Sequence, residues 1–427
     1  MALARSLFRV GAALTFAAAV SCGERDRPVR VWAFSLPAKA LRDFAPEFAA
    51  RNGRPLEVET VPWADMQKKV LLAVAARSGV PDLVVCDPMW IGGLIAAEGL
   101  SALDHDLSAP ERDRFFPPAL RTYEAGGHLY AAPLDIDMMV CFWRQDLFQP
   151  HLRDMGLGGF PKRIGEFETA ARALSASAPA GQRRYALLVD PSSMETLLMG
   201  WGPAFGVQWL SADLRRATFS SPQARRLLSF LMEALAPGAF GLRWNTRTDG
   251  DPFPLFRSGK VAVALAGPWF RKRLEEEAPE MAGQWRIAPL PIMDEACATG
   301  GLGGAALAIP VNAPDRAGGL AALRLMLSPA FLRRYFELVG SPPAVRDVWD
   351  WPELSTPLPY FGGQRYFQVV REAIDSAGPM PLAPGPESLE APLQWALHQA
   401  LAAGADPNAV LEEAVRRAQK ALDEAGS

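Results

Sequence analysis

Hydrophobic and polar positions follow two alternating patterns over residues 29–97. Three short, mostly apolar runs, at 29–34, 56–61 and 83–86, have the length of buried β-strands. The segments after these runs carry hydrophobic residues three or four positions apart, as amphipathic helices do. These positions are Leu41, Phe44 and Phe48, then Met66, Val70 and Val74, then the apolar residues of 90–97. Strands that alternate with helices in this way predict βαβ units and a mostly parallel sheet covered on both faces.

The α/β pattern resumes after an extended stretch at residues 129–143. The further predicted elements are helices at 167–174 and 227–235 and strands at 185–189 and 261–266. A glycine-rich segment at 299–304 then leads into a strand that ends at Pro310. The last predicted helix has Asp406 as its N-cap and Pro407 at its first position. The second half of the chain therefore builds a second α/β lobe.

Composition agrees with a folded protein of two domains. The chain has 427 residues and a mass of 46.3 kDa, with 49% hydrophobic and 21% charged residues, which is typical of globular proteins. Its 44 basic and 47 acidic residues are interspersed and give a net charge of -3, so no basic surface for nucleic acid is expected. After residue 21, no apolar run reaches the roughly 18 to 20 residues that span a bilayer.

The N-terminus has the pattern of a secretory signal peptide. Arg5 and Arg9 precede an uncharged, mostly apolar run at residues 10–20. The sequence AVSC at 19–22 resembles the lipobox of bacterial lipoproteins, in which the signal is removed before a cysteine that carries lipid. This resemblance implies a signal peptide at 1–21 and, at 22–28, lipidated Cys22 followed by a polar tether. An ordinary signal peptide with a cysteine near its cleavage site is the alternative.

The sequence lacks the common motifs of catalysis and cofactor binding. Its four histidines are isolated, no cysteine pair has zinc-site spacing, and neither a GxSxG nor a GxxxxGK motif occurs. Glycines at 300–304 precede a strand instead of opening a helix, so they favour a close approach of chain segments over phosphate binding. Cys86 and Cys141 lie in apolar runs and are expected to be buried thiols. We expect no metal, no cofactor and no catalysis, although 47 acidic residues leave a glycosidase-type pair open.

Tryptophan is the residue type that points to a ligand. The chain has 12 tryptophans and six tyrosines, and several tryptophans follow predicted strands. An indole can cover the apolar face of a sugar ring, a contact that contributes about 0.5 to 1.5 kcal/mol beyond burial, while carboxylates and amides bind the hydroxyls. The alternative is that most of these tryptophans belong to the hydrophobic core.

A series of segments resembles, in order and spacing, the family 1 extracellular solute-binding proteins of bacterial ABC importers, the maltose-binding type. The segments are GVPDLV at 79–84, LYAAP at 129–133 leading to RQDLF at 144–148, AGPW at 266–269, APLP at 288–291, and the stretches 303–310 and 404–419. The resemblance covers nearly the whole chain after the signal peptide. It implies a type II periplasmic-binding-protein fold, in which two α/β lobes, each a mostly parallel sheet flanked by helices, close around a ligand by a hinge.

The same resemblance implies the domain boundaries, the partners and the location. The N-terminal lobe would comprise residues 29–138 and 299–338, and the C-terminal lobe 139–298 and 339–427. The protein would be an exported monomer, held to the membrane by its lipid and facing the periplasm or the cell exterior. It would bind a mono- or oligosaccharide and deliver it to the transmembrane subunits of an ABC permease with their ATPase, without being an enzyme.

Residues of the ligand site are expected where strands end, because strand ends face the cleft in open α/β sheets. This rule nominates Phe34, Ser35, Trp63 and Asp87. Each of them follows one of the first three predicted strands.

The resemblance adds four further residues to the predicted ligand site. Asp137 lies in the segment that would cross between the lobes, where relatives often place a carboxylate that binds sugar hydroxyls; a solvated hinge charge is the alternative. Trp269, in the Gly-Pro-Trp turn, is predicted to stack on the sugar rather than to fill the core. Glu195 follows the strand at 185–189, and Trp395 lies on the helix after a proline-rich loop. Glu195 could equally be a charge on a helix surface.

Two departures from the family leave the ligand open. This chain has Trp143-Arg144 where relatives often have Tyr-Asn, and Cys86 where relatives can carry a contact residue. Alternative ligands are a polyol, a glycerol phosphodiester or a peptide, and an anionic ligand would require an arginine in the cleft, from among Arg144, Arg271 and Arg346. A secreted carbohydrate-active enzyme and a partner of a membrane sensor are the other function classes.

Overall fold

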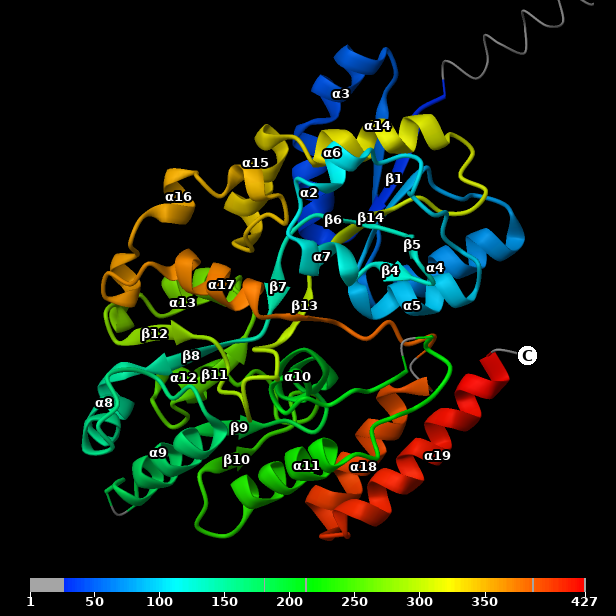
Figure 1. Cartoon of the computed structure of the whole chain (residues 1–427). Helices are drawn as coiled ribbons and strands as arrows, with labels where there is room; N and C mark the ends of the chain where they lie inside the picture. Colours follow the sequence, from blue (N-terminus) through cyan, green and yellow to red (C-terminus); the bar gives the residue numbers. More distant parts are fainter. Residues whose placement is uncertain (1–26, 180, 212, 386–387, 426–427) are drawn as a thin grey trace, which may run out of the picture.

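The computed structural model describes residues 27–179, 181–211, 213–385 and 388–425. They form two lobes, at the top and bottom of Figure 1, with β7, β13 and the chain around β15 running between them. The predicted signal peptide and Cys22 lie outside the described residues. Within the described part, no helix combines the length and the hydrophobicity needed to cross a membrane.

The N-terminal lobe is built on a five-stranded sheet in the order β2-β1-β3-β14-β6. The strands are β1 (Val29–Ala33), β2 (Leu56–Thr60), β3 (Leu83–Cys86), β6 (Ala132–Pro133) and β14 (Ala306–Ala308). β1 pairs in parallel with β2 and β3, and β14 runs antiparallel to β3 and β6. All four residues of β3 are buried, as its continuous apolar sequence predicts.

Helices cover this sheet, and α2 to α5 lie at the predicted positions. They are α2 (Ser35–Asp43), α3 (Ala45–Asn52), α4 (Trp63–Ala76), α5 (Pro88–Ala96), α6 (Ala109–Arg112), α7 (Pro117–Arg121), α14 (Arg316–Met326) and α15 (Pro329–Val339), with the hairpin β4 (Glu124–Ala125) and β5 (His128–Leu129) beside them. The stripe Leu41, Phe44 and Phe48 is divided between two helices, because Pro46 lies in the first turn of α3. Leu41 and Phe48 are nevertheless fully buried.

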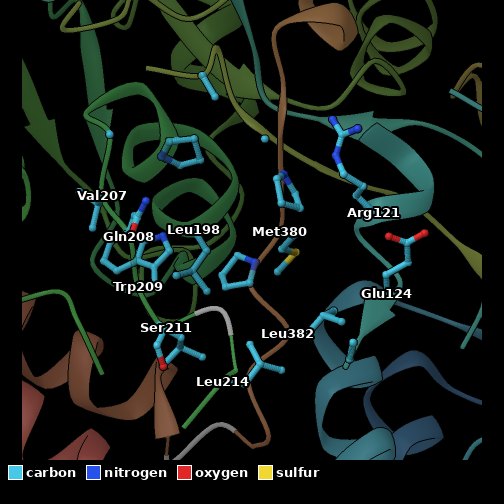
Figure 2. A pocket seen from close by; sticks show the side chains of 18 of the residues that line it. Arg121, Glu124, Leu198, Val207, Gln208, Trp209, Ser211, Leu214, Met380 and Leu382 are labelled. Atoms are coloured by element: carbon cyan, nitrogen blue, oxygen red, sulfur yellow. The ribbon is translucent and has the colours of Figure 1, made fainter. Parts of the chain in front are cut away.

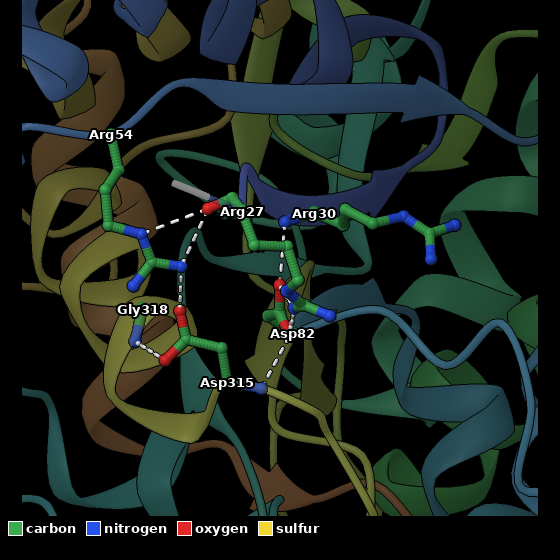
Figure 3. A network of polar contacts seen from close by, with 6 residues as sticks. All are labelled: Arg27, Arg30, Arg54, Asp82, Asp315 and Gly318. Carbon is green, nitrogen blue, oxygen red and sulfur yellow. Dashed lines mark hydrogen bonds and ion pairs between the residues drawn. The ribbon is translucent and has the colours of Figure 1, made fainter. Parts of the chain in front are cut away.

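A charged network ties the chain together at the edge of the sheet where β1 and β3 begin (Figure 3). Buried Asp82 accepts hydrogen bonds from the backbone N–H groups of Arg30 and Asp315, both at 2.9 Å, and forms an ion pair with Arg27. Asp315 pairs with Arg54 and caps α14. Each carboxylate in this network therefore has an arginine partner.

The C-terminal lobe differs from the parallel arrangement expected for each lobe. Its strands are β8 (Val140–Arg144), β9 (Leu187–Val189), β10 (Gly241–Arg243), β11 (Val263–Ala266) and β12 (Trp285–Ala288). β9 and β10 are parallel, but β8 is antiparallel to both β11 and β12. The direction of the chain explains this difference. β8 starts where the chain enters the lobe, and β11 and β12 end beside its first residues, so that Ala266 lies opposite Val140. The two-lobed α/β class is confirmed, and this sheet is the exception within it.

Most of the remaining helices surround these strands in the lower part of Figure 1, whereas α16 lies beside α15 in the upper part. They are α8 (Gln145–Asp154), α9 (Ile164–Ala176), the π-helix η1 (Thr196–Trp201), α10 (Gly202–Ala204), α11 (Pro222–Leu235), α12 (Phe253–Arg257), α13 (Phe270–Glu277), α16 (Pro352–Ser355), α17 (Tyr366–Asp375), α18 (Glu390–Ala403) and α19 (Pro407–Ala425), with short 3-10 turns at η2 (Pro279–Met281), η3 (Arg346–Val348) and η4 (Pro359–Phe361). The predicted final helix is confirmed as α19.

Strands from three distant parts of the chain pair where the lobes meet. β7 (Asp137–Met138) is antiparallel to β13 (Gly301–Gly303), which is parallel to β15 (Gly378–Pro379). At the end of β13, Gly304 has a φ of +124°, and a Cβ there would lie 2.3 Å from the Asp135 carbonyl oxygen. The close chain approach expected of the glycine-rich segment is therefore present.

The lobe boundaries predicted at 138/139, 298/299 and 338/339 stay predictions. Residues beyond 338 first contact the N-terminal lobe, since Pro343 bridges to Asp135 and Val345 to Phe115. Cys86 and Cys141 are buried free thiols, as expected.

Candidate functional site

A cavity of about 280 Å³ lies between the lobes, and we call it the interlobe cavity. Its size is near the lower end of the range of about 300 to 1,000 Å³ that is common for small-molecule sites. Both lobes and the crossing segments supply its walls. The lining residues are Phe34, Trp63, Asp87, Pro88, Met89, Asp135, Asp137, Glu195, Met199, Trp269, Gly304, Ala305, Tyr335, Val339 and Ser341. Six of the eight predicted ligand-binding residues are among them.

The N-terminal lobe contributes residues that directly follow its parallel strands. Phe34 follows β1, Trp63 begins the helix after β2, and Asp87 follows β3. Asp87 is the N-cap of α5 and accepts a hydrogen bond from the Met89 N–H at 2.9 Å. The Trp63 indole N–H donates to the other oxygen of Asp87 at 3.1 Å. The parallel register thus brings a carboxylate and an indole together at one sheet edge.

Aromatic rings form the wall behind this carboxylate. Buried Trp90 lies 5.0 Å from Trp63 and 6.0 Å from Phe34, measured between ring centroids. Trp63 itself is 49% exposed, so this large apolar surface is free to meet a ligand.

The crossing segment contributes two carboxylates at alternate positions of an extended chain. Asp135 is buried and accepts hydrogen bonds from the Ala305 N–H at 2.6 Å and from the Tyr335 hydroxyl at 3.2 Å. Asp137 pairs with Gly303 across β7 and β13, and its Oδ1 atom is buried without a hydrogen-bond partner among the described residues. An unsatisfied carboxylate oxygen beside a cavity is costly unless a ligand completes it.

The C-terminal lobe supplies Trp269 and Glu195. Trp269 lies three residues beyond β11, whose last residue, Ala266, pairs with Val140 near the crossing, and this register brings the indole beside Asp137. The Trp269 indole N–H lowers the pKa of Asp137. The backbone of Gly267 also lies against this carboxylate, since a Cβ there would be 1.8 Å from Asp137 Oδ1. Trp269 is 36% exposed.

Glu195 directly precedes the π-helix η1, and Met199 of that helix also lines the cavity. The Glu195 side chain is open to solvent within the cavity. π-Helical turns occur frequently at functional sites, because the extra residue redirects neighbouring side chains.

Asp87, Asp135, Asp137 and Glu195 are called here the four cavity carboxylates. Burial raises the pKa of Asp135 to about 7 against its two hydrogen bonds, and burial also raises the pKa of Asp87. Desolvation and the charges of its three carboxylate neighbours raise the pKa of Asp137 well above its ordinary value. Desolvation together with the Asp87 charge raises the pKa of Glu195. The four groups therefore repel one another, although Glu195 is open to solvent while the other three are partly or fully buried.

Two of the predicted residues lie outside the cavity. Ser35 is exposed at the first position of α2. Trp395, on α18, packs against the hydrophobic core of the C-terminal lobe, and the Arg417 guanidinium lies 3.9 Å from its ring centroid. The rotation of α18 against α11 and α19 decides this placement, and sequence spacing does not reveal it.

Sequence reasoning also missed residues that line the cavity, above all Asp135 and Tyr335. The signal for Asp135 was available, because residues two apart in an extended chain face the same side, and Asp137 was already nominated. Tyr335 carries no such signal, since it reaches the cavity from α15, which packs on α2.

The arginines considered for an anionic ligand are engaged elsewhere. Arg144 pairs with Asp146 at 2.7 Å, and Arg271 pairs with Glu275 at 2.7 Å. Arg346 donates to the Asp113 carbonyl oxygen. No arginine, lysine or histidine lines the interlobe cavity as the structure describes it. Trp143 and Cys86, the positions that depart from the family, are buried core residues and do not line it.

A larger cavity, of about 610 Å³, is lined by Trp209 and is called the Trp209 cavity. Figure 2 shows Trp209 and Leu198 on one side, Arg121 and Glu124 on the other, and Met380 between them. None of the predicted ligand-binding residues lines it. Its tryptophan is buried, whereas Trp63 and Trp269 are partly exposed in the interlobe cavity, which is therefore the better candidate for stacking on a ligand despite its smaller volume.

Comparison with known proteins identifies the family. The family model of the bacterial extracellular solute-binding proteins matches residues 35–331, well over half of the chain. The chain belongs to this family. The resemblance inferred from its sequence segments is thereby confirmed, and its family consists of binding proteins.

Individual relatives of this solute-binding protein are distant. A binding protein of Brucella abortus is 22% identical over 57% of this chain and 57% of its own length, so the match spans little more than half of that relative. An arabinooligosaccharide-binding protein of Halalkalibacterium halodurans is 23% identical over 76% of this chain and 73% of the relative. The sugar-binding protein MalE of Xanthomonas citri has a similar structure, with a TM-score of 0.79 and 22% identity over 93% of this chain and 98% of that one. This last likeness shows the fold.

Proposed function

We propose that this solute-binding protein captures a carbohydrate in the interlobe cavity and delivers it to the permease of an ABC importer. The observation that carries the proposal is the pairing, in one cavity between two lobes, of two partly exposed indoles with four carboxylates that have no ion-pair partner among the described residues. Indoles cover the apolar faces of sugar rings, and carboxylates accept hydrogen bonds from hydroxyls. Relatives named as sugar- and arabinooligosaccharide-binding proteins support the same ligand class.

The wider biology belongs to the same proposal. The chain is exported through the signal at 1–21, anchored by lipid on Cys22, and acts as a monomer facing the periplasm or cell exterior. Its proposed ligand-binding residues are Phe34, Trp63, Asp87, Asp137, Glu195 and Trp269, to which we add Asp135 because it lines the same cavity. The cavity volume of about 280 Å³ favours a mono- or disaccharide over a long oligosaccharide.

A thermal-shift screen of the purified protein against mono-, di- and trisaccharides and polyols tests this function. A ligand at about 100 times its dissociation constant stabilises the folded state by roughly 2.7 kcal/mol, which raises the midpoint of unfolding by a few degrees. A shift with one sugar class, without release of new reducing ends, is the expected result. Silence across the whole panel contradicts the proposal.

A carbohydrate-active enzyme is the second candidate, because acids with raised pKa are what glycoside hydrolysis requires. The product assay in the same screen separates the two, since only an enzyme generates reducing ends. A glycerol phosphodiester is disfavoured, because its negative charge would meet the four cavity carboxylates without a neighbouring base.

A further inference from the structure

We infer that the ligand of the interlobe cavity carries a protonated amine, so that the preferred cargo is an amino sugar or another cationic carbohydrate. This inference rests on the function proposed above and narrows its substrate class. It follows from the charge of the cavity, the unsatisfied groups in it and the position of its indoles.

The first observation is a charge imbalance confined to the cavity. Four carboxylates line it, and no basic side chain does. No ion pair between described residues includes any of the four, and no cation is among the causes of their pKa shifts. Buried or crowded charges are normally paired, since leaving one unpaired is costly. A cationic ligand would supply the missing counter-charge.

The second observation is that two of these groups have few hydrogen-bond donors beside them. The Trp269 indole N–H lies beside Asp137 and lowers its pKa, but no described residue makes a hydrogen bond of good geometry with Asp137 Oδ1. Glu195, on the opposite lobe, has no hydrogen bond or ion pair within the described structure. An ammonium group has three donors and no acceptor, whereas a hydroxyl brings one donor with two lone pairs. Carboxylates are acceptors only in their ionised form, and a neighbouring ammonium group would favour that form by opposing the rise in their pKa.

The third observation is the arrangement of the indoles. Trp63, from the N-terminal lobe, and Trp269, from the C-terminal lobe, both present partly exposed rings to the cavity. A cation over an indole face, within about 6 Å of the ring centroid, is attracted by the ring quadrupole. The same rings stack on a sugar, so one molecule can use both properties.

A bound metal ion could also neutralise the four cavity carboxylates, but their positions do not favour one. In the described part of the chain, no three or more His, Cys, Asp or Glu residues are placed to hold a metal ion. The acids are therefore spread around the cavity and suit an organic cation better than a point charge.

Calorimetric titration of matched sugar pairs at pH 7 tests the inference. The pairs are glucosamine and glucose, galactosamine and galactose, mannosamine and mannose, and the chitosan disaccharide and cellobiose. Within each pair only the amino or hydroxyl group at carbon 2 differs. At least one amino sugar should bind about tenfold or more tighter than its neutral partner, because charge-assisted hydrogen bonds are about twice as strong as neutral ones. The preference should weaken with added salt.

Charge-removing variants locate the effect. Asp137→Asn and Glu195→Gln keep the side-chain shape and should reduce the preference for the amine to below about threefold, while binding of the neutral partner changes less. A purely structural loss would lower both equally. Glu47→Gln, an acid-to-amide change on the surface of α3, is the matched control and should leave the preference unchanged. Circular dichroism confirms that each variant is folded.

The outcomes distinguish this inference from the function on which it rests. Neutral sugars that bind as tightly as their amino partners, or tighter, overturn the inference and leave carbohydrate binding standing. Binding of spermidine or choline without binding of any sugar overturns the carbohydrate function and the amino-sugar cargo together. If neither sugars nor these cations bind, both proposals are wrong.

Discussion

Carboxylates lie at both ends of the strands of the N-terminal sheet, and the two groups differ in whether a basic side chain pairs with them. Where β1 and β3 begin, Asp82 and Asp315 each have an arginine partner and backbone N–H donors. Asp87 follows the end of β3 and faces the interlobe cavity, where neither it nor the other three cavity carboxylates has a basic side chain beside it. The first arrangement is what stability requires. The second destabilises the empty protein, and a ligand is the natural explanation for keeping it.

The largest loss of stability is expected at the ion-paired carboxylates where β1 and β3 begin. Asp82→Ala leaves Arg27 unpaired and the N–H groups of Arg30 and Asp315 without their acceptor, which should cost about 3 to 5 kcal/mol of unfolding free energy. Chemical denaturation measures this loss. Glu353→Ala breaks an exposed pair with Arg333 and should cost less than about 1 kcal/mol. Equal losses for the two variants would show that the network is not what holds this edge.

At the interlobe cavity, where the carboxylates have no ion-pair partner, removal of one charge should stabilise the ligand-free protein. Asp137→Asn is expected to raise the unfolding free energy of the ligand-free protein by about 1 to 2 kcal/mol at pH 8, within the usual range for relieving strain at a functional site. The folded-state pKa of Asp137 is raised, so its proton is held more tightly in the folded than in the unfolded chain. Its contribution therefore turns unfavourable as pH rises above about 4, the ordinary pKa of an aspartate.

Thermal unfolding at pH 5 and pH 8 measures the pH dependence of this gain. The advantage of Asp137→Asn should be larger at pH 8 and should shrink toward pH 5. A variant that is less stable than the wild type at pH 8 would mean that the Asp137 carboxylate is satisfied by its surroundings.

Removal of one stacking platform should have a moderate effect on binding. Trp269→Ala is expected to weaken sugar affinity by about 1 kcal/mol or more, with the fold intact, because the indole is partly exposed and packs edge-on to Phe270 at 6.0 Å. Calorimetry with the best sugar of the screen measures the change. Unchanged affinity would remove Trp269 from the site.

The smallest effect is expected at a tryptophan that the sequence nominated and the structure places elsewhere. Trp395→Ala should change sugar affinity by less than about twofold, since this side chain stacks with Arg417 outside the interlobe cavity. It serves beside Trp269→Ala as a matched control for loss of an indole. A larger loss of affinity would extend the site to α18.

The place of a residue could be predicted from the sequence wherever a single strand or helix determines it. Phe34, Trp63 and Asp87 could be placed because parallel strands end at a common edge, and the buried stripe of α4 followed from spacing alone. Ser35, beside Phe34, satisfies the same rule but points outward at the start of α2, since neighbouring residues face different sides.

Positions that depend on packing between distant elements could not be predicted. The direction of β11 and β12 relative to β8, and hence the approach of Trp269 to Asp137, follows from where the chain crosses between lobes. Tyr335 reaches Asp135 across 200 positions of sequence. The absence of a base from the cavity is likewise a property of the assembled walls, because arginines such as Arg271 lie close in sequence to Trp269 yet pair elsewhere.

A crystal structure of the protein with its tightest-binding sugar would show whether the interlobe cavity is the ligand site. We expect the sugar in this cavity, with a ring against Trp269 and a donor within hydrogen-bond distance of Asp137. A sugar bound in the Trp209 cavity, or on an outer face with the four cavity carboxylates untouched, would contradict it.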